Sequence, residues 1–183
     1  PDQFPGYQKL SAPGVLEKFE KAWGTKLNPK EGTKATDCFG KMLTKEIRGL
    51  FIFGEDPVRT DPDTAHVIKA LKNLDFLVMD ELFLTETAKM ADVVLPGRSY
   101  AEKEGTFSNT ERRVQRIRKA VEIEGETKED IWIFTEIMNR MGYPQPHLTS
   151  AQVMDEVASV TPSFAGISHE RLDSEEVAGN GLQ

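Results

Sequence analysis

The chain has 183 residues and a formal net charge of −7, and 38% hydrophobic with 29% charged residues is ordinary for a globular protein. The acidic balance argues against nucleic acid as the main partner. No segment approaches the roughly 18 consecutive apolar residues of a membrane-spanning helix, and the single cysteine excludes an internal disulfide and a cysteine-only metal or cluster site within this chain. We therefore expect no membrane segment and a reducing, cytoplasmic location.

Residues 1–48 predict a helical lead-in. After a start rich in Pro and Gly, Ser11 can cap a helix that ends at Gly24, because glycine suits the residue that follows a helix. A coil rich in Gly, Pro and Lys comes next. Thr36 or Asp37 can then cap a second helix before the chain enters its first strand.

Three short apolar runs predict buried strands, at residues 50–53, 76–79 and 93–95. Each run is too short for a helix and is bounded by polar or turn residues. Near-continuous apolar runs of this kind are typical of parallel strands that are buried on both faces. The sequence therefore predicts an α/β fold built on a parallel sheet.

The segments between these strands predict helical crossovers. The DPDT sequence at 61–64 starts a helix with proline at the first helical position, so strand, helix and parallel strand form a right-handed crossover. Residues 81–91 leave room only for a short helix over about 85–90. In such folds ligands bind beyond the carboxyl ends of the strands, so the loops at 54–57, 80–81 and 96–99 are the first candidates for a site.

Residues 100–128 are polar, rich in turn formers and too long for a routine connection, so we expect an extended polar arm. A capping-box pattern at 127–130 predicts a helix immediately after this arm. Thr149 and Gln152 form a second such pattern ahead of a further helix. The acidic tail is expected to be flexible.

The residue types that most often carry out catalysis are sparse and scattered. His66, His147 and His169 are far apart and share no metal-ligand spacing with one another or with Cys38. Cys38 lies on a helical pattern, which favours a buried structural thiol over a nucleophile. The GxSxG turn, the GxGxxG fingerprint and the P-loop are all absent. We therefore expect no catalytic residue and no metal ligand within this chain.

Candidate binding residues follow the strands instead. Gly54 permits close approach of a ligand to the backbone, and Asp56 can accept paired N–H donors from a guanine- or pterin-like ring edge, although this segment also suits a plain turn. Asp80 can accept a ribose hydroxyl or cap the next helix. Thr60 can bond a phosphate or cap a helix. Asp130 fits the capping box by its spacing, yet it lies at a helix start that faces the same loops.

Four motifs occur in a fixed order, FIFGEDP, ELFLTETAKMADVVLP, AEKEGTFSNTERRVQRIRKAV and EIMNRMGYP, and FEKAWG precedes them near Phe19. With these motifs the chain resembles the molybdopterin oxidoreductase family over roughly residues 43–144. The resemblance is strongest to the large catalytic subunit of molybdenum- or tungsten-dependent formate dehydrogenases. It implies that the chain is an internal fragment of such a subunit.

The resemblance implies a partial dinucleotide-binding domain with a Rossmann-like, three-layer arrangement of parallel sheet and flanking helices. This domain, which binds a molybdopterin guanine dinucleotide, would comprise residues 49–99 and 129–160. Residues 1–48 would be a lead-in, 100–128 an arm toward the iron–sulfur domain, and 161–183 a flexible tail. The residues that the resemblance places around the guanine dinucleotide are Gly54, Asp56, Thr60, Asp80, Gly97 and Asp130.

The implied parent enzyme oxidises formate to carbon dioxide with a molybdopterin guanine dinucleotide that holds molybdenum or tungsten. Its iron–sulfur cluster would lie outside this chain, and its partners would be the other domains of the subunit and electron-transfer subunits. The alternatives are a nitrate reductase, the large subunit of an NADH dehydrogenase, or a non-catalytic interaction module. In such a module a run of basic residues would form the docking face. In the other cases the same residues form a solvated surface. The run consists of Arg112, Arg113, Arg116, Arg118 and Lys119.

Overall fold

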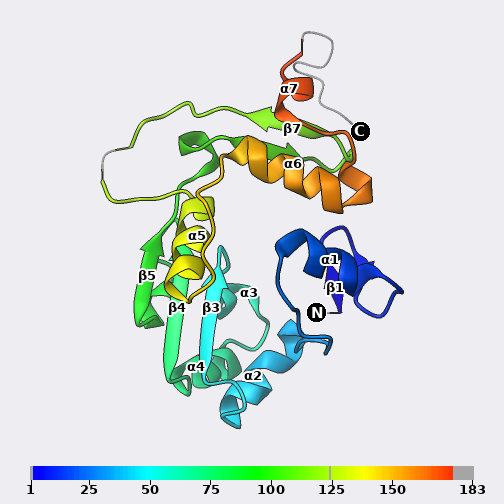
Figure 1. The fold of residues 1–183 in the computed structure, drawn as a ribbon. Helices are drawn as coiled ribbons and strands as arrows, with labels where there is room; N and C mark the ends of the chain where they lie inside the picture. Colours follow the sequence, from blue (N-terminus) through cyan, green and yellow to red (C-terminus); the bar gives the residue numbers. More distant parts are fainter. Residues whose placement is uncertain (1, 124, 175–183) are drawn as a thin grey trace. The chain divides into compact units, whose positions relative to one another are not determined.

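The computed structural model describes residues 2–123 and 125–174, which form two compact units (Figure 1). The sheet unit consists of Thr33–Glu102 and Val121–Gln145. The hairpin unit consists of Pro1–Gly32, Lys103–Ala120 and Pro146–Gln183.

The sheet unit is built on three parallel strands, β3 (Gly49–Phe53), β4 (Phe76–Glu81) and β5 (Val93–Pro96). They lie in the order β3-β4-β5, and Val78 of β4 pairs with residue 51 on one side and residue 93 on the other (Figure 1). This arrangement confirms the predicted α/β fold with a parallel sheet. All three strands consequently end at one edge.

Helices cover both faces of this sheet. On one face, α2 (Ala35–Leu43) and α4 (Thr64–Lys72) enclose a core with α3 (Pro57–Thr60) and β4. The buried residues of this core are Met42, Val58, Val67, Ala70, Leu71 and Leu77. On the other face, Phe134 of α5 (Asp130–Arg140) packs its ring 5.5 Å from that of Phe51 and 5.2 Å from that of Phe53. The layers are therefore helix, sheet and helix.

The expectation that the strands are buried on both faces is wrong. Phe53 and Phe76 are each about half exposed, at 50% and 51%, and Val93 is 37% exposed. Burial alternates along β3, because the side chains at 50 and 52 pack into the core while their neighbours point to the α5 face. Among the described residues α5 contacts only part of that face, so its apolar side chains stay accessible to water.

Several helix starts also differ from prediction. α1 (Val15–Trp23) begins after Gly14 rather than at Ser11, although it ends at Gly24 as predicted. α2 begins at Ala35, so Thr36 and Asp37 lie inside its first turn and do not cap it. For α4 the cap is Asp63, whose carboxylate accepts the N–H of residue 66, and the proline at 62 precedes the helix. The helix expected over about 85–90 is the short η1 (Ala88–Met90).

The hairpin unit contains strand pairs and short helices. β1 (Gln3–Phe4) pairs with β2 (Gln8–Lys9), and β6 (Gly105–Ser108) pairs with β7 (Val114–Ile117), both antiparallel. The second hairpin lies inside the segment that the sequence predicts to be an arm, which begins with η2 (Tyr100–Glu102) of the sheet unit. A small core joins β7 to the C-terminal helices through Val114, Met154, Ile167 and Leu172.

The C-terminal elements of the hairpin unit are α6 (Ser150–Val160), η3 (Pro162–Phe164) and α7 (His169–Leu172). The predicted capping box at the start of α6 is confirmed, because Thr149 and Gln152 exchange side-chain and backbone hydrogen bonds. The segment expected to be a flexible tail thus holds η3 and α7 in its described part, and residues 175–183 lie outside the described residues. No helix in the described part of the chain has the length and apolar character needed to span a membrane.

Candidate functional site

The ends of β3 and β4 are joined through Gly54. This glycine has a φ of 61°, a left-handed conformation that a side chain would strain, and it directly follows the last residue of β3. Its N–H donates to the carbonyl of Asp80 over 2.9 Å, so the turn begins where the ladder between the two strands ends. Two of the six predicted site residues are therefore neighbours at the carboxyl edge of the sheet.

Asp80, Gly97 and Asp130 meet at the same edge. Gly97 is buried, and a Cβ placed on it would lie 2.8 Å from Oδ1 of Asp80 and 3.2 Å from Oδ1 of Asp130. The side chain of Asp80 is itself only 1% exposed. Two carboxylates thus approach one glycine, and only the missing side chain leaves room for both. The three positions span 50 residues of the sequence, from 80 to 130, and the fold brings them together.

A short backbone connection brings the start of α5 to this place. Lys128 forms a parallel bridge with Gly97, and its N–H donates to the carbonyl of Pro96 over 3.2 Å. α5 begins two residues later, with Glu129 in the cap position and no side-chain cap. The capping box predicted at 127–130 is therefore wrong, and Asp130 occupies the first turn, where the helix dipole favours a negative charge.

Asp56 bridges two loops. Its Oδ1 accepts the hydroxyl of Thr87 over 2.6 Å and the N–H of Thr87 over 3.1 Å. The hydroxyl oxygen of Thr87 in turn accepts the N–H of Val58 over 3.1 Å, and the Thr87 side chain is fully buried. Sequence reasoning missed Thr87, although it stands in the TET triplet of the second motif. The loop after β3 is consequently fixed to the segment that follows β4.

Thr60 belongs to the same loop. It is the last residue of α3, it is exposed, and its hydroxyl donates to the carbonyl of Asp56 over 3.1 Å. This bond is internal to α3 rather than a cap of the next helix. The structure thus links the predicted residues in two groups, with Gly54, Asp80, Gly97 and Asp130 in one and Asp56 and Thr60 in the other.

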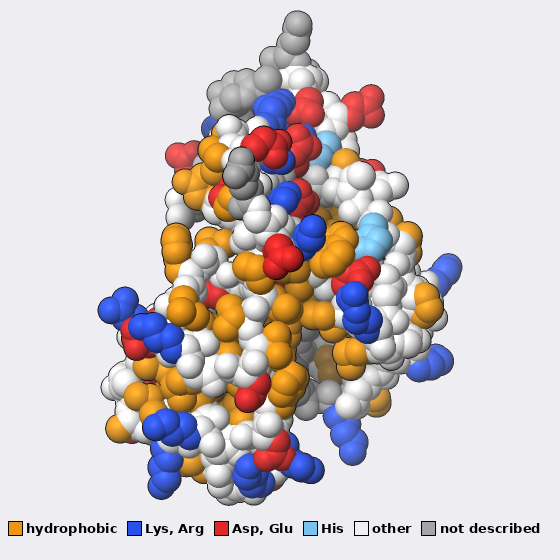
Figure 2. All heavy atoms as spheres, turned by 90° about the vertical axis from the view of Figure 1, so that its left-hand side faces the viewer, with side chains coloured by type: hydrophobic (Ala, Val, Ile, Leu, Met, Phe, Trp, Pro, Cys, Tyr) orange, Lys and Arg blue, Asp and Glu red, His pale blue; other side chains and the backbone are white. Residues whose placement is uncertain are grey.

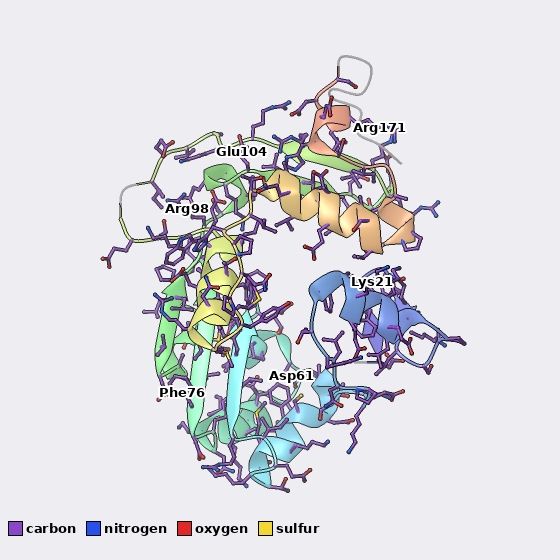
Figure 3. All side chains as sticks on the ribbon, in the orientation of Figure 1. Lys21, Asp61, Phe76, Arg98, Glu104 and Arg171 are labelled. Carbon is purple, nitrogen blue, oxygen red and sulfur yellow. The ribbon has the colours of Figure 1, made fainter. Side chains whose placement is uncertain are left out.

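Both groups of residues offer hydrogen-bond acceptors to a ligand. Asp56, Asp80 and Asp130 present carboxylate oxygens, which accept N–H and O–H donors of a neutral ring or sugar. Arg98, which follows β5, adds a positive charge at this edge, 3.8 Å from Oε1 of Glu129 (Figure 3). Among the described residues no group of three or more His, Cys, Asp or Glu side chains is arranged to hold a metal ion.

Part of the basic run is paired with acidic side chains within the hairpin unit. Arg116 is 9% exposed at its side chain and pairs with Glu104 at 3.8 Å and with Asp173 at 3.1 Å. Arg118 pairs with Asp173 at 2.6 Å. Much of this run is therefore engaged in the packing of its own unit, which weighs against a single free basic docking face.

Cys38 is half-buried and packs against the core of α2 and α4. This position agrees with the structural thiol that its helical pattern predicts. His66 and His147 lie in the sheet unit and the hairpin unit respectively, and His169 is buried in α7. Cys38 and His66 thus belong to the sheet unit, and His147 and His169 belong to the hairpin unit.

The sheet unit is thus an α/β arrangement of parallel strands with flanking helices, a class in which ligands typically bind beyond the carboxyl ends of the strands. A family model described as molybdopterin oxidoreductase matches residues 11–140. The chain belongs to the molybdopterin oxidoreductase family, as its motifs predict, and the cofactor of this family is a molybdopterin.

Curated relatives share this segment. The chain is 48% identical over 174 residues to the F420-dependent formate dehydrogenase subunit alpha of Methanocaldococcus jannaschii and 45% identical over 174 residues to that of Methanococcus maripaludis. A putative formate dehydrogenase of Staphylococcus haemolyticus is 45% identical over 172 residues. Each match covers 94% of this chain, but the chain spans only 25% of the two archaeal subunits and 18% of the bacterial protein.

A solved structure has a similar fold. Acetylene hydratase from Pelobacter acetylenicus superposes with a TM-score of 0.60 at 25% sequence identity, over 86% of this chain and 23% of the hydratase. The parallel sheet with its flanking helices is therefore an arrangement that this enzyme also contains.

Proposed function

We propose that this chain supplies one wall of a molybdopterin guanine dinucleotide site in the catalytic subunit of a formate dehydrogenase. The observation that carries the proposal is the meeting of Asp80, Gly97 and Asp130 at the carboxyl edge of the sheet, in a chain that is 48% identical to a formate dehydrogenase alpha subunit. The two carboxylates supply acceptor oxygens at this edge for a ligand rich in N–H and O–H donors. The guanine and ribose of the cofactor have such donors.

The residues have distinct roles in this proposal. Asp80 and Asp130 accept hydrogen bonds from the nucleotide, Gly54 lets the backbone after β3 come close to it, and Gly97 leaves room for the two carboxylates. Asp56 and Thr60 complete the loop after β3, and Arg98 offsets the acidic charge of the wall. The redox chemistry of formate oxidation would come from the molybdenum or tungsten of the bound cofactor. This chain binds and orients the nucleotide end.

The remaining parts of the enzyme lie outside this chain in the proposal. They are the domains that hold the metal ligand and an iron–sulfur cluster, together with electron-transfer subunits. A cytoplasmic location is part of the same proposal. The acetylene hydratase similarity leaves another activity of the family as the alternative, but its 25% identity is well below the 43–48% of the formate dehydrogenase relatives.

The binding proposal is tested by nuclear magnetic resonance of the isotope-labelled chain titrated with guanosine diphosphate. We expect backbone shifts to change at Gly54, Asp80 and Gly97, and adenosine diphosphate to give smaller changes at the same concentration. No change with guanosine diphosphate, or changes confined to the hairpin unit, would overturn the proposal.

A second assay tests whether the catalytic groups lie outside this chain. Formate oxidation by the chain alone, followed with an artificial electron acceptor, is expected to give no turnover. Turnover by the isolated chain would contradict the proposal that the catalytic groups lie elsewhere in the subunit.

A further inference from the structure

We propose that Thr87 is a positioning residue for the cofactor site and that it restricts Asp56 to a single oxygen for ligand contact. This inference rests on the proposed function, and it concerns how the acceptor groups of the site are divided. Thr87 is fully buried and takes no direct part in the edge where Asp80, Gly97 and Asp130 meet.

The two carboxylate oxygens of Asp56 are in different environments. Oδ1 accepts both the hydroxyl of Thr87, over 2.6 Å, and its N–H, over 3.1 Å. A carboxylate oxygen has two lone pairs, so these two bonds fill the hydrogen-bonding capacity of Oδ1. Asp56 makes no side-chain bond to its own helix α3, for which it stands in the cap position. Oδ2 accepts no hydrogen bond among the described residues, so it is the oxygen that can take a donor from a ligand.

Thr87 also holds the backbone of the loop that carries Asp56. The hydroxyl oxygen of Thr87 also accepts the N–H of Val58, over 3.1 Å. One threonine therefore holds the side chain at 56 and the backbone at 58, and the first turn of α3 becomes fixed to the segment before η1. Both Thr87 and Val58 are buried, so water does not readily replace these bonds.

The bonds to Thr87 limit the number of donors that Asp56 can accept from a ligand. Paired donors, such as the ring N–H and the exocyclic amine of guanine, need both oxygens of one carboxylate. Asp56 cannot offer both, and it contacts the ligand through one donor only. The expectation from sequence, that Asp56 accepts paired donors from a ring edge, is replaced by a contact with a single hydroxyl or N–H.

Variants of the full chain separate positioning from folding. Thr87→Ser keeps the hydroxyl, whereas Thr87→Val keeps the shape and removes it. Asp56→Asn keeps an oxygen that can accept from Thr87 and replaces the second oxygen by a donor. The affinity for guanosine diphosphate is measured by the same resonance titration, and the amide exchange of Val58 reports on the bridge.

We expect Thr87→Ser to bind guanosine diphosphate within about twofold of the wild type and Thr87→Val to bind roughly tenfold more weakly with faster exchange at Val58. For Asp56→Asn we expect slow exchange at Val58 but roughly tenfold weaker binding, because the free oxygen is lost. Unchanged affinity in folded Thr87→Val or in Asp56→Asn would overturn this inference alone. If the wild-type chain does not bind guanosine diphosphate, the proposed function fails, and this inference fails with it.

Discussion

Gly97 is the residue at which the smallest change has the largest expected effect on the site. Its backbone passes so close to two carboxylates that a Cβ would lie 2.8 Å from Asp80 and 3.2 Å from Asp130. Asp80 is almost fully buried at the end of β4, so it cannot turn into water to make room. A glycine here is required by close approach, whereas at Gly54 it is required by the left-handed backbone.

Gly97→Ala is therefore expected to destabilise the sheet unit by about 1–3 kcal/mol, because one carboxylate must shift. Urea denaturation measures this change. Gly40→Ala is the matched control, since Gly40 is exposed in the middle of α2 and a Cβ there meets nothing within 4 Å. The control is expected to be more stable than the wild type by roughly 0.5–1 kcal/mol. Equal stability of the two variants would contradict the close approach at Gly97.

His169 in α7 is buried in the hairpin unit, and its Nε2 atom is buried without a hydrogen-bond partner among the described residues. Burial, and next the positive charge of Arg116, lower the pKa of His169 from its ordinary value of 6.5, although the carboxylates of Asp173, Glu104 and Asp155 act in the opposite direction. A histidine with a lowered pKa in the folded state binds its proton more readily when the chain is unfolded.

His169 should therefore reduce stability as the pH falls. Neutral His169 makes its full contribution to the free energy of unfolding above the unfolded pKa of 6.5. This contribution is lost as the pH falls below 6.5 and through the lower pKa of the folded state. Stability measured by denaturation between pH 8 and about pH 5 should fall less in His169→Gln than in the wild type. His147→Gln makes the same change at an exposed position and is the control. Parallel curves for all three proteins would contradict this prediction.

At the scale of the elements, helix starts in this chain depend on different devices. α6 has a complete capping box, α4 has a single aspartate cap, and α1, α2 and α5 have no side-chain cap. The first turn of α5 instead carries Asp130 near the strand ends, so the start of that helix is placed by the bridge between Lys128 and Gly97. The helix that faces the site is thus positioned by the sheet rather than by its own cap.

Thr149→Ala is expected to cost about 1 kcal/mol in the stability of the hairpin unit, because the first turn of α6 loses the acceptor for the Gln152 N–H. Thr36→Ala makes the same exchange inside the first turn of α2, where threonine caps nothing, and should change stability by less than about 0.5 kcal/mol. Thermal unfolding of both variants measures the difference. Similar melting temperatures for both would show that the capping box contributes little.

At the scale of the whole molecule, much apolar surface of the sheet unit is open to water. Phe83 and Leu84, in the loop after β4, are 76% and 65% exposed, and Phe76 is 51% exposed. Figure 2 shows apolar side chains spread between charged ones on the face viewed from the side of β5. Phe83 and Leu84 are adjacent, and contiguous exposed apolar side chains are typical of a face that another surface covers. This agrees with a chain that spans 25% of its archaeal relatives.

Phe83→Ser should reduce the fluorescence of a dye that binds exposed apolar surface, with a change in stability of less than about 0.5 kcal/mol. Phe19→Ser provides the contrast, because Phe19 is fully buried between Phe4 and Trp23 and its loss should cost several kcal/mol, on the order of 3–5. Unchanged dye fluorescence in Phe83→Ser would show that the loop is not the binding surface.

The sequence determined what depends on neighbours along the chain. Apolar runs bounded by turn residues predicted the three strands, Gly24 the end of α1, and Thr149 with Gln152 the start of α6, because strand propensity and capping act over a few residues. The ordered motifs identified the family. The absence of catalytic motifs also follows directly from the residue types present.

Only the tertiary structure decided what depends on residues far apart in the chain. The approach of Asp80 and Asp130 to Gly97 spans 50 positions, and the bond from Thr87 to Asp56 spans 31. Neither has a local pattern, so Asp130 was predicted to be part of a capping box and Thr87 was missed. Burial of the strands was also misjudged, since an apolar strand has the same local sequence whether or not a second layer covers it. Pairing across loops is set by how the strands align, and that alignment follows from packing of the whole unit.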